Sequence, residues 1–300
     1  MIFSLSSPAF LGLIVALGLL PLAARSQTEA PDLFARSNLV AWCIVPFDAK
    51  KRGPADRAEL VQRLGLTAVA YDWRPEHVPQ FEQEILEYQK RQLKYFAFWG
   101  QHDEAYRLFE KHGLKPQFWL MFRSPNASTQ AEKVRLAVEQ LLPIVQRAAK
   151  LGSPVALYNH GGWAGEPENM VAVCRELRER HGAKHVGIVY NLHHGHDHLD
   201  RFASILALMQ PYLLCINLNG MTPNGDKIGK KILPLGQGER DLQLLRDIRA
   251  SGYRGPLGIL GHTQNDVEDQ LRDNLDGLDW LVAQLEGRPA GPKPKARTLP

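Results

Sequence analysis

The chain has 300 residues, of which 44% are hydrophobic and 23% charged, and its formal net charge is +4. These ordinary proportions suit one large globular domain or two small ones. The basic residues are scattered and form no run before the C-terminal tail, so the charge pattern argues against a nucleic-acid-binding protein.

The first 26 residues have the pattern of a signal peptide. The apolar stretch at 10–20 is too short to span a membrane comfortably, and Ala24 and Ser26 are small residues at the positions that a signal peptidase reads. We therefore expect cleavage before Gln27, export to the periplasm or the extracellular space, and no stable membrane insertion afterwards. An uncleaved N-terminal anchor is the alternative. Residues 27–37 are then a linker.

Strand-like and helix-like segments alternate through the rest of the chain. The predicted strands are short runs rich in Val, Ile, Leu, Phe and Tyr, as strands buried on both faces should be, and they lie at 39–47, 66–73, 94–99, 117–122, 155–160, 186–191, 213–219 and 257–261. Helical patterns such as 54–64 separate them. Eight strands with a helix after each predict an α/β fold, a (β/α)8 TIM barrel that forms a single domain over 38–286. An open doubly wound sheet is the alternative, but no glycine-rich phosphate turn follows the first strand.

Two further features concern the cysteines and the C-terminus. Cys43, Cys174 and Cys215 lie in apolar patterns and are expected to be buried and to behave as small hydrophobic residues. Residues 287–300 are rich in proline and basic side chains, which predicts a disordered tail.

Polar side chains gather where the last four predicted strands end. The carboxyl ends of all strands of a TIM barrel open onto one face, and active sites lie there. Side chains alternate along a strand, so the register that points Ala156, Gly187, Cys215 and Gly258 into the barrel lumen also points a polar set inward. That set includes Tyr158, His160, Asn191, Asn217, Asn219 and His262. We predict that His160 and His262 are acid–base groups and that Tyr158 and the asparagines bind substrate.

The ends of the other strands add candidates. Asp72 ends the second strand and is a candidate catalytic carboxylate. Arg123 could hold a carboxylate or phosphate, although a salt bridge to Asp72 or another acid at the rim explains it equally well. Three tryptophans could stack on a sugar or could equally be core residues; they are Trp73, Trp99 and Trp163.

Four segments together carry a family resemblance. They are Leu157–Gly162, Gly187–His194, Pro234–Asp241 and Tyr253–Leu260. They resemble the xylose-isomerase-like TIM barrels, a superfamily of sugar phosphate isomerases and epimerases with endonuclease IV as a more distant relative. The resemblance covers about residues 38–284. It implies a divalent metal that polarises a carbonyl and a hydroxyl while carboxylates move a proton through an enediolate.

The family's metal ligands are changed in this chain. Tyr158 occupies the position where the family has a glutamate at the end of the fifth strand, and residues 191–194 replace its Asp-x-x-His motif. Asn217 occupies the position of the histidine on the seventh strand, and the position of the glutamate on the eighth strand is near His262. Losing three carboxylates disfavours the usual magnesium or manganese site. Two interpretations remain. A divalent zinc, manganese, cobalt or nickel ion binds His160, His194 and His262, with His193 as the alternative to His194, or neutral histidines act without a metal.

The leading hypothesis is an isomerase- or epimerase-like enzyme. It would act on a small sugar or keto-sugar by proton transfer next to a carbonyl. A lyase or hydratase acting on keto-glycosides by the same chemistry is the variant, and a non-catalytic carbohydrate-binding barrel is the rival from another class. The carboxylate ligands of the three-zinc endonucleases are missing and no basic stripe is present, so we expect no nucleic-acid partner.

Overall fold

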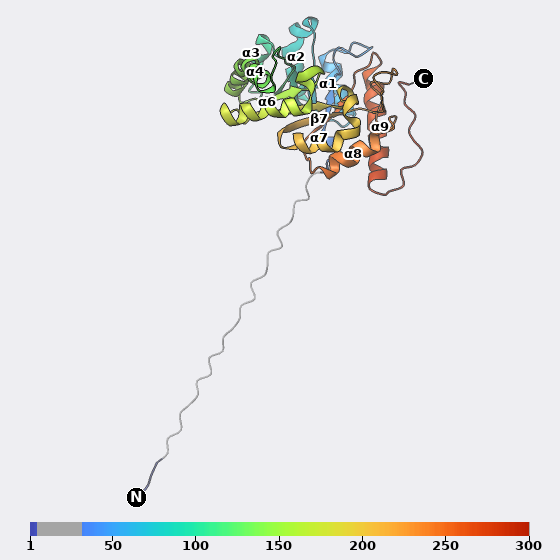
Figure 1. Ribbon diagram of the computed structural model, residues 1–300. Coiled ribbons are helices and arrows are strands. Elements are labelled where there is room, and N and C mark those ends of the chain that lie inside the picture. Colours follow the sequence, from blue (N-terminus) through green and yellow to red (C-terminus); the bar gives the residue numbers. More distant parts are fainter. Residues whose placement is uncertain (5–31, 300) are drawn as a thin grey trace. The chain divides into compact units, whose positions relative to one another are not determined.

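The computed structural model describes residues 1–4 and 32–299 (Figure 1). Within 32–299, eight parallel strands form a closed barrel in chain order, and β1 closes the ring against β8. The prediction of a single-domain (β/α)8 barrel is confirmed. The strands are β1 Leu39–Trp42, β2 Ala68–Tyr71, β3 Lys94–Trp99, β4 Gln117–Leu120, β5 Val155–Tyr158, β6 Val186–Asn191, β7 Leu213–Leu218 and β8 Leu257–Leu260.

Helices follow the strands and cover the outside of the barrel (Figure 1). They are α1 Pro54–Arg63, α2 Phe81–Lys90, α3 Asp103–Lys111, α4 Gln130–Leu151, α5 Gly162–Gly165, α6 Pro167–Arg180, α7 Phe202–Met209, α8 Asp241–Ala250 and α9 Val267–Leu285. Short 3-10 helices are inserted, of which η2 Pro75–Gln80 and η3 Leu192–His194 follow strand ends. In the described part of the chain, no helix combines the length and apolar character needed to cross a bilayer.

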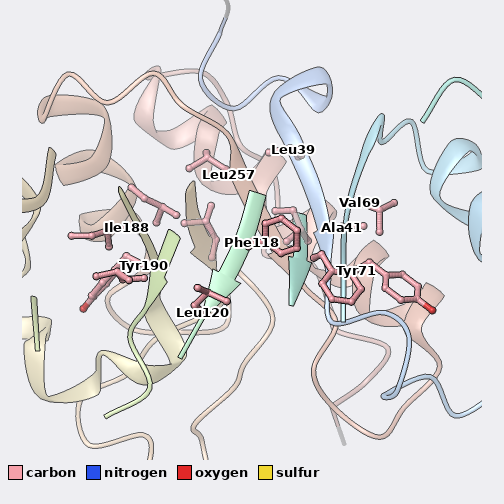
Figure 2. Close-up of a cluster of buried hydrophobic side chains, with 14 of the residues drawn as sticks. Leu39, Ala41, Val69, Tyr71, Phe118, Leu120, Ile188, Tyr190 and Leu257 are labelled. Atoms are coloured by element: carbon pink, nitrogen blue, oxygen red, sulfur yellow. The ribbon is translucent and has the colours of Figure 1, made fainter. Parts of the chain in front are cut away.

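Alternation along the strands sorts the apolar side chains into two cores. In β1, Val40 and Trp42 belong to a cluster inside the barrel, whereas Leu39 and Ala41 belong to the larger cluster between barrel and helices. In β4, Trp119 points inward between two outward neighbours. Figure 2 shows outward residues of several strands, among them Tyr71, Phe118, Leu120, Ile188 and Tyr190. Both faces of the strands are therefore buried, which is why their sequences are almost wholly apolar.

The two ends of the chain differ in what can be described. Of the predicted signal peptide only residues 1–4 are described, so cleavage and export stay predictions. The described part of the predicted linker already belongs to the domain, because Leu33 and Phe34 are buried in the outer core.

The C-terminal segment, for which the sequence predicts a disordered tail at 287–300, contacts α9 through Arg297 and Thr298. The buried carboxylate of Asp273 accepts hydrogen bonds from the backbone N–H groups of Arg297 and Thr298, both at 2.9 Å. It also accepts bonds from the Arg297 guanidinium and the Thr298 hydroxyl, both at 2.8 Å. Composition predicts solvation of such a segment, but a buried carboxylate needs donors, and the tail supplies them.

Candidate active site

A cavity of about 110 Å³ lies at the carboxyl ends of the strands. Seven residues singled out from the sequence line it together: Asp72, Trp99, Tyr158, His160, His193, His194 and His262. All three predicted catalytic residues and all three predicted metal ligands are in this set. The fold thus brings the ends of β2, β3, β5, β6 and β8 to one place.

Four histidines form a continuous cluster on the wall. His193 and His194 belong to η3, directly after β6, and their ring centroids lie 3.9 Å apart. The ring of His160 is 4.4 Å from that of His194, and the ring of His262 is 5.8 Å from that of His193. The buried ring of His193 has no hydrogen-bond partner for either nitrogen among the described residues.

Burial keeps the imidazoles of His193, His194 and His262 neutral. It lowers the pKa of His194 to about 3, with a further contribution from the charge of His160, and it lowers the pKa of His193 well below the usual value. Burial also lowers the pKa of His262 to about 4, helped by the charge of Arg74. At neutral pH these three rings therefore offer neutral nitrogens, which can donate or accept a hydrogen bond according to tautomer.

Asp72 is the carboxylate of the cavity. It is buried, and its Oδ1 accepts a weak bond of 3.4 Å from the backbone N–H of Val45. Its Oδ2 is buried and has no partner within the described chain. Burial raises the pKa of Asp72 to about 7 against the opposing charge of Arg74. A carboxyl group with this pKa exchanges protons near neutral pH.

The end of β1 interrupts strand alternation and shapes the floor. Cys43 adopts a left-handed conformation with φ of 59°, and both Trp42 and Cys43 face the interior. The Cys43 Sγ lies 4.0 Å from Nδ1 of His262, and burial raises the thiol pKa well above its usual value, so the thiol is protonated. The Trp42 ring lies 5.7 Å from that of Trp99, which in turn is 4.4 Å from that of Tyr158. These rings make an apolar floor.

A bulge in β3 turns Trp99 toward this floor. The register against β2 shifts after Val69, so that Phe96 and Ala97 both face the barrel interior and Phe98 faces outward. Without the extra residue, Trp99 would point to the helices, because alternation has a period of two.

Two of the three predicted rim tryptophans are elsewhere, which is a correction. Trp73 follows Asp72, so alternation turns it outward onto Phe98, and its Nε1 donates to the Trp99 carbonyl at 2.8 Å. Trp163 packs at its ring edge against Phe122, and its Nε1 donates to the side chain of Gln130. Of the three tryptophans predicted from their position at strand ends, only Trp99 lines the cavity.

The predicted asparagines also do not line the cavity. Asn191 and Asn217 point inward as expected, but they are buried and bond to each other, with Asn217 Nδ2 donating to Asn191 Oδ1 at 2.6 Å. A Cβ at Gly258 would lie 1.8 Å from Oδ1 of Asn217, so this glycine makes room for the pair. Asn219 is buried beside Gly220. The bond between Asn191 and Asn217 holds the neighbouring strands β6 and β7 together, whereas the Oδ1 of Asn219 has no hydrogen-bond partner among the described residues.

Arg123 lines an adjoining pocket of about 370 Å³ rather than the cavity itself. The two spaces share the side chains of Tyr158 and His160. A ligand could therefore have its reacting end in the cavity and the remainder in this pocket.

Four residues of the wall were not among the predicted site residues: Trp42, Cys43, Phe47 and Arg74. Arg74 carried a usable signal, since it has the same inward parity as Asp72. The Cys43 turn carried none, because a left-handed cysteine cannot be read from sequence. Phe47 packs on His262, with ring centroids 3.7 Å apart.

The side chains as placed do not fit the metal site that the family resemblance implies. Among residues 1–4 and 32–299, no three histidine, cysteine, aspartate or glutamate side chains are arranged to hold a metal ion. His160, His194 and His262 share one cavity but do not form such a group. We therefore derive no catalytic step through a metal.

A family model described as the xylose isomerase-like TIM barrel matches residues 58–283. This chain belongs to that family. No curated protein matches it. Among solved structures, an E. coli 3-keto-D-glucoside 4-epimerase has a TM-score of 0.61 at 16% identity, covering 82% of this chain and 99% of the other.

Two further structures with the same fold contain metals. A zinc-bound IOLI protein has a TM-score of 0.61 at 13% identity, with 82% and 98% of the two chains covered. A magnesium complex of a xylose isomerase-like barrel from Mycobacterium smegmatis has a TM-score of 0.53 at 16% identity, with 80% and 92% covered. At these identities the likeness establishes the fold alone.

Proposed function

We propose that this xylose isomerase-like barrel is an enzyme that isomerises or epimerises a sugar or keto-sugar. The reaction moves a proton at a carbon next to a carbonyl through an enediolate. One observation carries the proposal: a buried carboxyl group with a pKa near 7 and an unpartnered oxygen lines the same cavity as a cluster of neutral imidazoles.

Asp72 is suited to be the base. Its carboxylate takes the proton from carbon, and the electron pair of that C–H bond forms the carbon–carbon double bond of the enediolate. Brønsted behaviour favours a base whose pKa lies near the working pH, and burial sets this value at Asp72. Its unpartnered oxygen is available because no protein donor within the described chain occupies it.

The histidines are suited to handle the oxygen atoms. The carbonyl oxygen gains negative charge as the proton leaves carbon, and a neutral imidazole N–H can donate to it. Return of the proton to the neighbouring carbon gives an isomer, provided that the former carbonyl oxygen takes up a proton and the hydroxyl on the first carbon gives one up, a transfer between oxygens that a neutral imidazole can relay. Return of the proton to the opposite face of the same carbon gives an epimer. The second route needs another acid on the opposite face of that carbon, and His160, which lines the cavity, is the candidate for this role.

Carbon-bound proton exchange in D₂O tests the proposal directly. The protein is incubated with a panel of ketoses and 3-keto-glycosides, and loss of carbon-bound protons is followed by NMR. Asp72→Asn should reduce the exchange rate by about 10² or more, the usual contribution of a positioned base. Asp200→Asn is the matched control, because Asp200 has a side chain that is 90% exposed and is paired only with Arg240.

The alternatives give other results. Release of an unsaturated or dehydrated product identifies the lyase or hydratase variant. Sugar binding without exchange, with or without added zinc or manganese, identifies the carbohydrate-binding barrel and contradicts the enzyme. Exchange that is unchanged in Asp72→Asn contradicts the role given to this carboxylate.

A further inference from the structure

Arg74 is a cation on the wall of the cavity. It follows Asp72 and Trp73 after β2 and precedes η2, and it is half-buried. Its guanidinium carbon lies 5.4 Å from the centre of the Phe47 ring, and Nη1 donates to the Trp73 carbonyl at 2.7 Å. These contacts hold the guanidinium at the site.

This guanidinium forms no ion pair with any carboxylate of the described residues. Within residues 32–299 it makes no ion pair, although the chain has many other arginine–carboxylate pairs, such as Arg57–Glu84 at 2.6 Å. Asp72 is the acidic side chain on the described cavity wall, and no hydrogen bond joins it to Arg74.

The surroundings leave the positive charge uncompensated. Three of the cavity histidines are neutral, because burial lowers the pKa values of His193, His194 and His262. Lys231 is near enough for its charge to lower all three further. An excess of positive charge in a partly buried cavity favours an anionic ligand over a neutral one.

We propose that the substrate is a sugar acid whose carboxylate binds Arg74. The inference rests on the proposed function for the reaction at this site and adds the class of substrate. A carboxylate presents two coplanar oxygens that match the guanidinium fork. A space of about 110 Å³ with one guanidinium suits this planar group better than a phosphate ester with its additional oxygens.

Calorimetric titration with matched ligand pairs tests this substrate class. The pairs are D-glucuronate with D-glucose and D-galacturonate with D-galactose, and acetate serves as a small probe for the carboxylate alone. The acids should bind at least about tenfold more tightly than their neutral partners, as expected for a charge-assisted hydrogen bond. Their affinity should decrease as salt is raised.

Variants assign the effect to one side chain. Arg74→Gln should remove the preference for the acids, and Arg74→Lys should retain part of it because it keeps the charge but not the fork. Arg246→Gln is the control, since Arg246 is exposed on α8 and bonds only to Gln243; it should leave binding unchanged. Thermal unfolding of each variant verifies the fold.

Several results would overturn the inference. They are equal affinity for acids and neutral sugars, no carboxylate binding by any probe, a preference for D-glucose 6-phosphate over D-glucuronate, or a preference for acids that survives in Arg74→Gln. A loss of kcat in Arg74→Gln with unchanged binding would also overturn it, because the guanidinium would then stabilise only the enediolate. Arg74-dependent binding without proton exchange would refute the proposed function while supporting the carboxylate site.

Discussion

Replacement of Asp72 by asparagine should make the protein more stable at alkaline pH while it reduces proton exchange. Burial raises the pKa of this carboxyl to about 7, compared with about 3.9 in an unfolded chain. Because the folded pKa lies above the unfolded one, the folded state binds the proton more tightly. The contribution of Asp72 to stability is therefore fully present below about pH 4 and is lost as pH rises through 7.

The size of this effect follows from the two pKa values. A difference of about three pH units corresponds to about 4 kcal/mol once the carboxylate is ionised in both states. Asparagine has nearly the same shape and never ionises. We expect wild type and Asp72→Asn to unfold at similar temperatures at pH 4, and the variant to unfold roughly 10 °C higher at pH 8.

Thermal unfolding followed by circular dichroism between pH 4 and 8 measures the difference. Titration of the histidines changes the unfolding temperatures of both proteins alike, so it cancels in the difference between wild type and Asp72→Asn. Asp200→Asn should show no growing difference, because its side chain is 90% exposed. A stability difference that stays constant with pH, or a variant less stable than wild type at pH 8, would refute the assignment of a raised pKa to Asp72.

Three further predictions concern other groups. Arg57→Met leaves the buried carboxylate of Glu84 without its partner and should cost about 3–5 kcal/mol in urea unfolding; a cost below 1 kcal/mol would contradict a buried pair. Asp273→Ala removes four hydrogen bonds to the tail and should make 288–299 sensitive to limited proteolysis, whereas wild type resists. His262 has a folded pKa of about 4, so its contribution to stability is present above pH 6.5 and is lost as pH falls. His262→Asn should therefore reduce the loss of unfolding free energy between pH 6.5 and 4. An unchanged dependence of that free energy on pH would contradict a buried neutral ring at His262.

The fold was predictable because it depends on short-range regularities. All eight predicted strands overlap the observed ones, and β6 at Val186–Asn191 was predicted with its bounds. Runs of apolar residues separated by amphipathic helices have few arrangements other than a closed barrel. The grouping of His160, Asp72 and His262 was predictable for the same reason, since every strand of a parallel barrel ends on one face.

The functional role of neighbouring residues was less predictable. Asp72 and Trp73 are adjacent, yet one faces the cavity and the other the helices. Strict alternation of side chains along a strand correctly assigns these two residues to opposite faces. The same rule gives the wrong face for Trp99, because a bulge adds a residue to β3. The buried asparagines show a related problem, because a polar residue at a strand end can bind a ligand or can bond to another strand. The role of such an asparagine depends on which side chain lies next to it in the fold, and that neighbour is distant in sequence, as Asn191 is from Asn217.

The order of apolar strands and amphipathic helices, readable along the chain, was enough to predict a closed parallel barrel and the face that holds the polar residues. Tertiary structure alone decided which side chains enter the cavity and in which protonation state. The left-handed turn at Cys43 and the bulge in β3 change the direction of side chains locally. The pKa values of Asp72 and the histidines depend on burial by residues from several strands, and burial is a property that no single segment carries.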